Sequence, residues 1–171
     1  AIARLNLPLK GLGEDGYLIR AATVNGKATT VIAANRDIGV LYGVFRYLSL
    51  IQTRQPVDNL RIESAPKVKL RMLNHWDNLD RTVERGYAGQ SIFDWWKLPG
   101  HVDPRIVDYA RTNTSIGING AVLNNVNAKA DSLTAPYIAK IAALADTLRP
   151  YGIKVYLSAR WSAPVELGGL K

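Results

Sequence analysis

The sequence predicts an α/β protein in two parts: a small N-terminal α/β domain of a hairpin and a helix, then strands and helices in the order β-α-β-α-β. Three observations carry this prediction. Two strand-like runs flank an Asn-Gly dipeptide, two prolines bracket a polar connector, and the apolar runs beyond it alternate with helical patterns. A β-α-β order builds a parallel sheet, either an open doubly wound sheet or a (β/α)8 barrel. Three strands cannot close a barrel, so a barrel would be represented here only by its opening portion.

The N-terminal part begins with a predicted hairpin. Residues 17–23 and 28–34 are strand-like. Between them stands Asn25-Gly26, the dipeptide that most readily supplies the two positive φ values of a type I′ turn. The two runs are therefore expected to pair with each other.

A helix is predicted directly after the hairpin. Asn35 or Asp37 is the expected N-cap, because the side chains of both residue types accept hydrogen bonds from free backbone N–H groups. The apolar residues recur at spacings of three and four, which indicates one buried stripe packed on the hairpin. The members of this stripe are Leu41, Phe45, Leu48 and Ile51.

A polar connector separates the two parts. Pro56 and Pro66 bracket it, and proline removes backbone donors and disfavours helix. The boundary is accordingly expected near residues 55 to 67. The predicted domains are residues 1–62 and residues 67–171.

The second part is predicted to contain three strands and two helices. The strands are expected at residues 68–74, 118–124 and 153–158. Asp103 is the expected N-cap of a helix that has Pro104 at its first position and runs to about Thr114. Thr134 is the expected cap of a second helix reaching Arg149, whose apolar face comprises Tyr137, Ile141, Leu144 and Leu148 and which Pro150-Tyr151-Gly152 ends.

Composition excludes several classes of protein. A hydrophobic content of 47% is typical of a globular core, and no stretch reaches the roughly 20 apolar residues that span a bilayer. The net charge of +8 is spread along the chain without a basic run or a nucleic-acid motif, so no nucleic-acid partner is predicted. The absence of cysteine excludes disulfides and thiolate metal sites. No glycine-rich dinucleotide or phosphate-binding loop follows a strand, and the compartment stays open between cytoplasm, periplasm and secretion.

Polar and aromatic residues gather where each strand of the second part ends. Three segments follow the strands in turn: Asn74 to Asp77, Asn124 to Asn127, and Arg160 with Trp161. Parallel α/β folds bind their ligands at this carboxyl edge, because the loops that follow the strands converge there. The sequence therefore predicts a site at this edge.

Several of these residues have two readings. Trp76 is either packing under a loop or a platform for a sugar ring, and its position favours the platform. Trp95 and Trp96 are both interpreted as packing residues. His75 has no neighbour at metal-ligand spacing, so no metal site is predicted. Two sets of residues remain open. Asp77, Asp80 and Glu84 are either paired with Arg81 and Arg85 or catalytic. The asparagines of "NNVN" either bond their own backbone or bind ligand hydroxyls.

These residues resemble a known family. The segments "LNHWDNLDRTVERGYAGQSIFDWW", "INGAVLNNVNAK" and "KVYLSARWSAP" look like the start of the barrel in the α-glucuronidases of glycoside hydrolase family 67. The segment "DIGVLYGVFRYLSLIQT" is similar to the helix of their small N-terminal domain. The resemblance covers nearly the whole chain and implies the opening β-α-β-α-β portion of a (β/α)8 catalytic barrel.

The resemblance implies an enzyme that removes α-1,2-linked 4-O-methylglucuronic acid from xylan-derived aldouronic acids, with inversion and without a cofactor. The catalytic carboxylates would come from later strands, beyond Lys171, so none of the acidic residues here inherits that role. Trp76 and Val126 match family positions that form an apolar sheath around the uronate. Asn125 and Arg160 are candidate substrate-binding residues on position alone. The resemblance is compatible with a homodimeric parent.

Two alternatives to this function remain. The first is a non-catalytic carbohydrate-binding or interaction module, which would also use exposed aromatic residues and a basic surface. It would have to be complete within 171 residues, whereas the element order suggests an interrupted sheet. The second is an enzyme of the family 20 hexosaminidase type, whose mark would be a consecutive Asp-Glu pair after a later strand.

Overall fold

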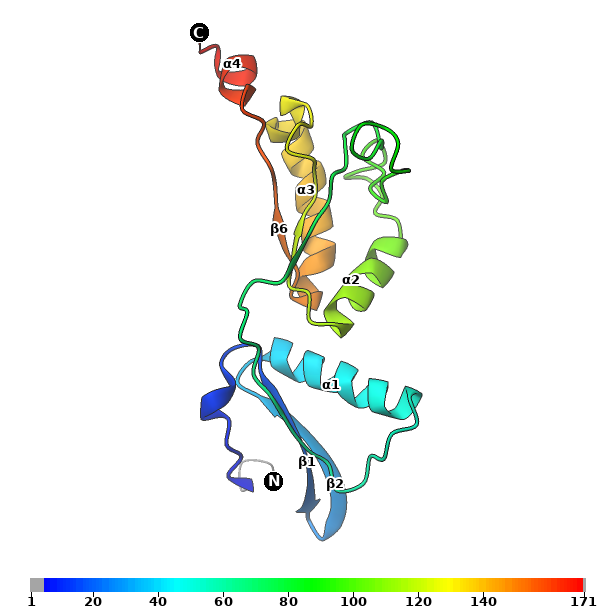
Figure 1. Ribbon diagram of the computed structural model, residues 1–171, viewed down its shortest axis with the longest axis vertical. Helices are drawn as coiled ribbons and strands as arrows, with labels where there is room; N and C mark the ends of the chain where they lie inside the picture. The colour runs from blue at the N-terminus through cyan, green and yellow to red at the C-terminus, as the bar shows by residue number, and fades with distance from the viewer. Residues whose placement is uncertain (1–4, 171) are drawn as a thin grey trace. The chain divides into compact units, whose positions relative to one another are not determined.

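The computed structural model describes residues 5–170, which form two compact units (Figure 1). The first reaches Lys69 and includes Ser115–Gly117. The second comprises Leu70–Thr114 and the chain from Ile118 onward. Each unit contains a three-stranded sheet with helices, so the predicted α/β class is confirmed. Within the described range, no helix combines the length and the apolar character needed to cross a bilayer.

The sheet of the first unit is built on the predicted hairpin. Strands β1 (Tyr17–Val24) and β2 (Lys27–Ala34) pair antiparallel from Tyr17↔Ala34 to Val24↔Lys27. Asn25 has φ 50° and Gly26 has φ 76°, the positive values that the type I′ turn requires. The predicted hairpin is therefore confirmed. A two-residue turn of this type also fixes the register of both strands.

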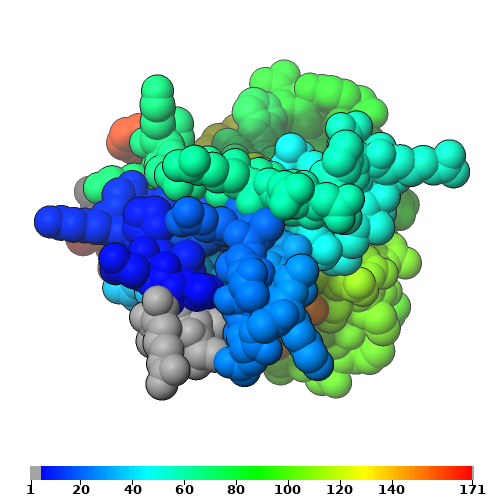
Figure 2. Space-filling model, turned by 90° about the horizontal axis from the view of Figure 1, so that it is seen from below, coloured from blue at the N-terminus to red at the C-terminus, as the bar shows by residue number. Residues whose placement is uncertain are grey.

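A third strand, β3 (Arg61–Ser64), was not predicted. It pairs antiparallel with β1 and gives the sheet the order β2-β1-β3. Figure 2 shows the segment after the helix lying beside the hairpin. The strand is short and its side chains are mostly polar, so it has no periodic apolar signal of its own. It runs two residues beyond the predicted domain end at 62.

Helix α1 (Asp37–Gln52) covers this sheet, but the predicted caps are wrong. Arg36 stands at the N-cap and makes no side-chain cap bond. The Asn35 side chain instead donates to the carbonyl oxygens of Leu9, at 2.9 Å, and Gly13, at 2.8 Å. Asn35 therefore ties down the segment around the short 3-10 helix η2 (Lys10–Leu12) instead of capping the helix.

The predicted stripe of α1 is also wrong. Leu48 and Ile51 are 44% and 50% exposed, and Leu41 and Phe45 are only half-buried. The buried positions are Gly39, Tyr42, Gly43 and Leu50. A Cβ atom at Gly43 would come within 2.5 Å of Ile32 Cγ2, which shows how closely the helix backbone approaches β2. The helix approaches the sheet through glycines, which carry no apolar side chain. The spacing of the large apolar residues therefore predicted a different buried face.

The second unit has the predicted β-α-β-α-β order. Strands β4 (Met72–Asn74), β5 (Gly120–Val122) and β6 (Lys154–Tyr156) are parallel and lie in the order β4-β5-β6. Helices α2 (Arg105–Ser115) and α3 (Ala135–Leu148) form the connections, and α4 (Ala163–Gly168) follows β6. The strands are each shorter than predicted. Two 3-10 helices, η3 (Ala130–Leu133) and η4 (Arg149–Tyr151), flank α3.

The helix ends follow the sequence signals only in part. The Asp103 carboxylate accepts a hydrogen bond from the Arg105 backbone N–H at 2.9 Å, and this bond holds the pKa of Asp103 below its usual value, as expected of an N-cap. Thr134 is the N-cap residue of α3, but its hydroxyl donates to the Asp131 carbonyl, so the predicted cap bond is absent. Gly152, with φ 72°, ends η4 as predicted.

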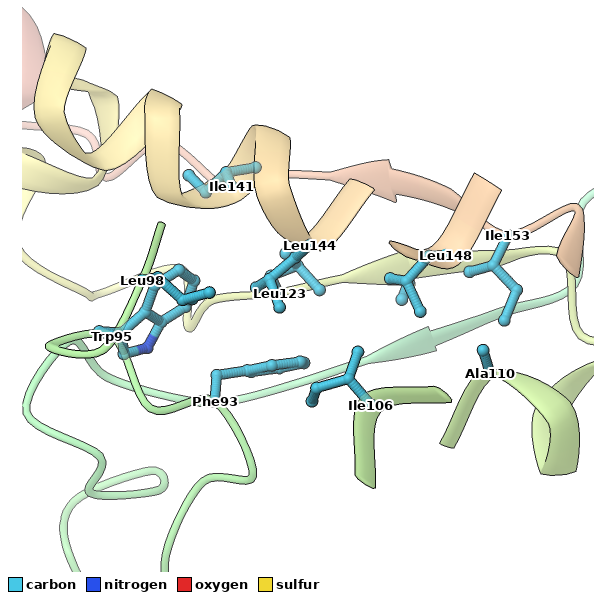
Figure 3. Close-up of a cluster of buried hydrophobic side chains, with 11 residues drawn as sticks. Phe93, Trp95, Leu98, Ile106, Ala110, Leu123, Ile141, Leu144, Leu148 and Ile153 are labelled. Atoms are coloured by element: carbon cyan, nitrogen blue, oxygen red, sulfur yellow. The ribbon is translucent and has the colours of Figure 1, made fainter. Parts of the chain in front are cut away.

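The core of the second unit lies between its sheet and α2 and α3 (Figure 3). The predicted face of α3 is confirmed, since Ile141, Leu144 and Leu148 are at most 7% exposed. Figure 3 shows Leu144 beside Leu123, with Phe93 of the long loop facing them. This packing anchors the long loop between β4 and α2 to the helices.

Candidate functional site

The segments that follow β4, β5 and β6 lie together at one edge of the second unit's sheet. His75 N donates to Val122 O at 2.9 Å, and Leu123 N donates to Tyr156 O at 3.1 Å. Beyond the strands, Asn125 N donates to Asp77 O at 2.8 Å. Because these parallel strands are neighbours, the segments after them face the same edge, as the sequence predicted.

Asn124 fixes the segment after β6. Its side chain donates to Ser158 O at 2.9 Å and accepts from Ser158 N at 2.9 Å. The residue is only 1% exposed, so both bonds are shielded from water. The amide therefore extends the β5–β6 pairing beyond the last ladder bond.

Asn125 holds the segments after β4 and β5 together. Its side-chain oxygen accepts from Asn127 N at 2.9 Å, and its amide nitrogen donates to Trp76 O at 3.4 Å. The residue is 4% exposed. Of the two readings of "NNVN", bonding to its own turn is displayed by Asn125, whereas Asn124 bonds the backbone of the distant Ser158. Their side chains position the edge.

Trp76 and Val126 offer apolar surface at this edge. Each is 48% exposed, so both present apolar surface to solvent. The backbone of Trp76 is fixed, because its carbonyl accepts from Glu84 N at 2.8 Å as well as from Asn125. A half-exposed indole on a held backbone suits contact with the C–H face of a sugar ring.

His75 and Asp77 flank Trp76; Asp77 is buried and His75 is partly buried. His75 Nε2 lies 2.7 Å from the Tyr109 hydroxyl of α2, and His75 Nδ1 lies 3.7 Å from an Asp77 carboxylate oxygen. Burial, together with the negative charge of Asp77, raises the pKa of Tyr109 to about 12. The group is a local network, and among the described residues no cluster of three His, Asp or Glu side chains could hold a metal ion.

The charged residues of the long loop pair only in part as expected: Arg85 Nε lies 3.8 Å from a Glu84 carboxylate oxygen, but Arg81 takes another partner. The Arg81 guanidinium lies 3.0 Å from the Asp94 carboxylate and donates to Ser91 O at 3.0 Å, so its pairing with Asp80 or Glu84 is wrong. Asp80 accepts from the Thr82 hydroxyl and backbone N–H, and these bonds lower its pKa. Arg81 therefore anchors the loop and is not part of a catalytic pair.

The adjacent tryptophans of this loop behave differently. Trp95 is 1% exposed and lies in the core, as predicted. Trp96 is 59% exposed, so its interpretation as packing is wrong. The Arg81 guanidinium carbon lies 5.2 Å from the centre of its ring, within cation–π range. The two residues stand side by side in a turn that Lys97 N closes on Asp94 O at 2.9 Å, yet one indole is buried and the other exposed.

Arg160 and Trp161 lie at the entrance to α4. Arg160 Nε is 3.3 Å from a Glu166 carboxylate oxygen, and Trp161 is fully exposed. They line an open cavity of about 550 Å³ whose other walls are largely apolar: Leu133, Ala159, Ala163, Pro164 and Leu167. The Glu166 pairing was not foreseen, because α4 itself was not predicted. Its signal was the Ser162-Ala163-Pro164 start, a typical helix opening.

A smaller cavity separates the first two segments of the edge. It has a volume of about 340 Å³ and is lined by Asn127 and residues that directly follow the two segments, with Asp131 of η3 and Tyr137 of α3. Trp76 and Val126 do not line it. The edge thus has two hollows, with the exposed Trp76 and Val126 outside both.

Both parts of the chain match models of one family. Residues 50–171 match the glycosyl hydrolase family 67 middle domain, and residues 1–47 match the glycosyl hydrolase family 67 N-terminus. The chain is 40% identical over 162 residues to the probable alpha-glucuronidase A of Aspergillus oryzae, covering 93% of this chain and 18% of the relative. It is 38% identical over 162 residues to alpha-glucuronidase A of Emericella nidulans, covering 92% of this chain and 18% of the relative. The chain thus spans about a fifth of the length of these curated relatives, and it belongs to glycosyl hydrolase family 67.

Proposed function

We propose that this chain is the N-terminal portion of an α-glucuronidase that hydrolyses α-1,2-linked (4-O-methyl)glucuronic acid from xylan-derived aldouronic acids. The observation that carries the proposal is the ordered match of both family models, with relatives that are named alpha-glucuronidase A. The structure supports it with half-exposed apolar surface at the carboxyl edge of a parallel sheet. Membership of family 67 argues against the hexosaminidase alternative.

The second unit is proposed to be the opening of a (β/α)8 barrel, preceded by a separate N-terminal domain. In support, its three strands are parallel and in sequence order, and each crossover contains a helix packed on the sheet. We assign residues 1–62, with the rest of β3 to Ser64, to the N-terminal domain and residues 67–171 to the barrel. Inverting hydrolysis needs two carboxyl groups roughly 6.5 to 9.5 Å apart, with room for a water between them. In this proposal both lie on later strands of the parent.

The role of this chain in the reaction is to bind and orient the sugar. Trp76 and Val126 are proposed to contact the uronate ring and its 4-O-methyl group. Asn125 contributes by holding the backbone under Trp76, and Arg160 by its place on the adjacent segment. An apolar wall excludes water from one face of the sugar, which strengthens polar interactions with the rest of the ligand.

The first test is kinetic and uses the full-length enzyme. Trp76→Ala is expected to lower kcat/KM on a 4-O-methylated aldouronic acid by about 5- to 150-fold, corresponding to roughly 1 to 3 kcal/mol of lost apolar contact. Trp96→Ala is the matched control, because Trp96 is an exposed indole of the same loop whose guanidinium neighbour already covers its ring. The control is expected to stay within about twofold. Equal values for parent and Trp76→Ala would contradict the assignment.

The second test concerns the methyl group. Val126→Asn replaces an apolar contact with an amide that needs hydrogen-bond partners. We expect the preference for the 4-O-methylated over the unmethylated uronate to weaken, measured as the ratio of kcat/KM on the two substrates. An unchanged ratio would contradict the proposed contact between Val126 and the methyl group.

The third test concerns where the catalytic groups lie. Residues 1–171 alone are expected to release no glucuronic acid from aldouronic acids, whereas the full-length enzyme is active. Turnover by the pure 171-residue chain would return the catalytic role to the acidic residues of its long loop, with Asp77, Asp80 and Glu84 as the first candidates.

A further inference from the structure

We propose that His75 and Tyr109 form a positioning pair, which sets the direction of the Trp76 indole from beneath the site. The inference rests on the proposed function, because it assigns to the pair a role in binding the same sugar. His75 and Tyr109 touch no substrate in this scheme. They act through the backbone that carries Trp76.

The first argument is the alternation of side chains around Trp76. The segment from residue 75 to residue 77 continues β4, and the side chains of His75 and Asp77 are 19% and 6% exposed. Trp76 between them is 48% exposed. In an extended segment, neighbouring side chains point to opposite sides. A displacement of the imidazole on the buried side therefore turns the indole on the open side.

The second argument is that Tyr109 is a fixed reference point. It lies on α2 between Ile106 and Ala110, which are 2% and 0% exposed in the core. The Asn113 side chain donates to the Tyr109 carbonyl at 2.8 Å. The phenol hydroxyl is 2.7 Å from His75 Nε2, so the bond joins the start of the loop to a packed helix.

The third argument is that the Phe93 ring packs against both members of the pair. Phe93 packs edge-on against His75 at 5.2 Å and against Tyr109 at 6.4 Å between ring centres. Deletion of the hydroxyl would leave the facing imidazole nitrogen poorly paired in an apolar setting, which costs more than the net value of the bond. The hydrogen bond therefore selects one placement of His75.

The fourth argument concerns the bonds that hold the backbone of Trp76. The Trp76 carbonyl oxygen accepts hydrogen bonds from Glu84 N and from the Asn125 side-chain amide. These bonds tie Trp76 to the long loop and to the segment after β5. His75 adds a bond to α2 through Tyr109, and Asp77 Oδ1 lies 3.7 Å from its Nδ1.

The experiment is a double-mutant cycle on the full-length enzyme, with kcat/KM measured on a 4-O-methylated aldouronic acid. Tyr109→Phe keeps the ring and removes only the hydroxyl, and we expect about a tenfold loss. In a Trp76→Ala background, the same change is expected to have less than about a twofold effect, because the indole that the pair directs is gone. Tyr151→Phe, at the opposite end of the core, is the control and is expected to stay within about twofold.

A second pair of variants separates positioning from packing. His75→Gln retains hydrogen-bonding groups that can reach the phenol, whereas His75→Phe retains an aromatic ring without them. We expect His75→Gln to keep several-fold more kcat/KM than His75→Phe. Rescue by the polar variant is a result that simple filling of space would not give.

The outcomes are distinguishable. If Tyr109→Phe costs the same factor with and without Trp76, or costs less than about twofold in the parent, the positioning role is overturned while the proposed function stands. If the full-length enzyme does not release glucuronic acid, the proposed function is overturned and the pair's role with it. Non-additive losses together with rescue by His75→Gln would establish the pair.

Discussion

Helices α1 and α3 both pack on a sheet, but only the buried face of α3 could be predicted from its apolar pattern. Both cover a three-stranded sheet within their own unit. Helix α3 buries Ile141, Leu144 and Leu148, large side chains at the spacing that the sequence displays. Helix α1 buries Gly39 and Gly43 beside Tyr42 and Leu50, while Leu48 and Ile51 stay about half exposed. The difference teaches that periodicity detects packing by side chains and misses packing by close backbone approach.

The energetic consequence is opposite for the two helices. On α3 stability comes from filled volume, so removal of atoms is costly. On α1 stability depends on space kept empty, so addition of atoms is costly. Substitutions that delete or add carbon atoms on each helix test this contrast directly.

The largest effect is expected from Leu144→Ala on α3. Leu144 is 1% exposed in the core, and its truncation leaves a cavity at a cost of about 2 to 5 kcal/mol in the free energy of unfolding. Denaturant unfolding, with the slope checked for constancy, measures the loss. A loss below about 1 kcal/mol would mean that this face of α3 repacks easily, and the contrast with α1 would break down.

Gly39→Ala is expected to follow. A Cβ atom there would come within 2.4 Å of Gly16 O and 2.6 Å of Ala34 Cβ, so backbone must move. We expect destabilisation of about 1 to 3 kcal/mol. Gly168→Ala on α4 is the matched control, since its Cβ would meet nothing closer than Leu170 Cγ at 4.0 Å. That variant is expected to be neutral or slightly stabilising, because alanine favours the helix. Equal effects of the two changes would show that close approach is not the reason for Gly39.

Gly43→Ala is expected to cost less, on the order of 1 kcal/mol, since the clash is with a side-chain methyl and alanine recovers part of the loss through its helix propensity. Its Cβ would lie 2.5 Å from Ile32 Cγ2. The double variant Gly43→Ala with Ile32→Val, which retains Cγ2, separates methyl contact from general crowding. If Ile32→Ala, which removes that methyl, does not reduce the penalty of Gly43→Ala, the close approach to β2 is not its cause.

The smallest effect is expected from Leu48→Ala on α1. The side chain is 44% exposed, so truncation should change the free energy of unfolding by less than about 1 kcal/mol. This variant is the counterpart of Leu144→Ala: the same substitution on the other helix. Comparable losses from the two, under the same unfolding conditions, would restore the stripe that the sequence predicted for α1.

The candidate site likewise has features that the sequence predicted and features that it did not. Its location at the carboxyl edge, with Trp76 and Val126 exposed there, follows from the strand order and the residue types. The bonds that hold the site could not be predicted from the sequence. Asn124 bonds Ser158 and His75 bonds Tyr109, and these partners are distant in sequence. Arg81 pairs with Asp94, although acidic residues stand closer to it in the sequence. Local spacing favoured Arg81 with Asp80, yet Asp80 is satisfied by Thr82.

The sequence by itself determined the elements whose signal is local. The Asn25-Gly26 turn, the Asp103-Pro104 helix start, the apolar face of α3 and the β-α-β-α-β order each depend on residues within a few positions of one another, where propensity and hydrogen bonding act. Only the tertiary structure decided the rest. The edge strand β3, the glycine face of α1, and the partners of His75 and Arg81 depend on which distant backbone or side chain arrives at contact distance, and no local pattern encodes that distance.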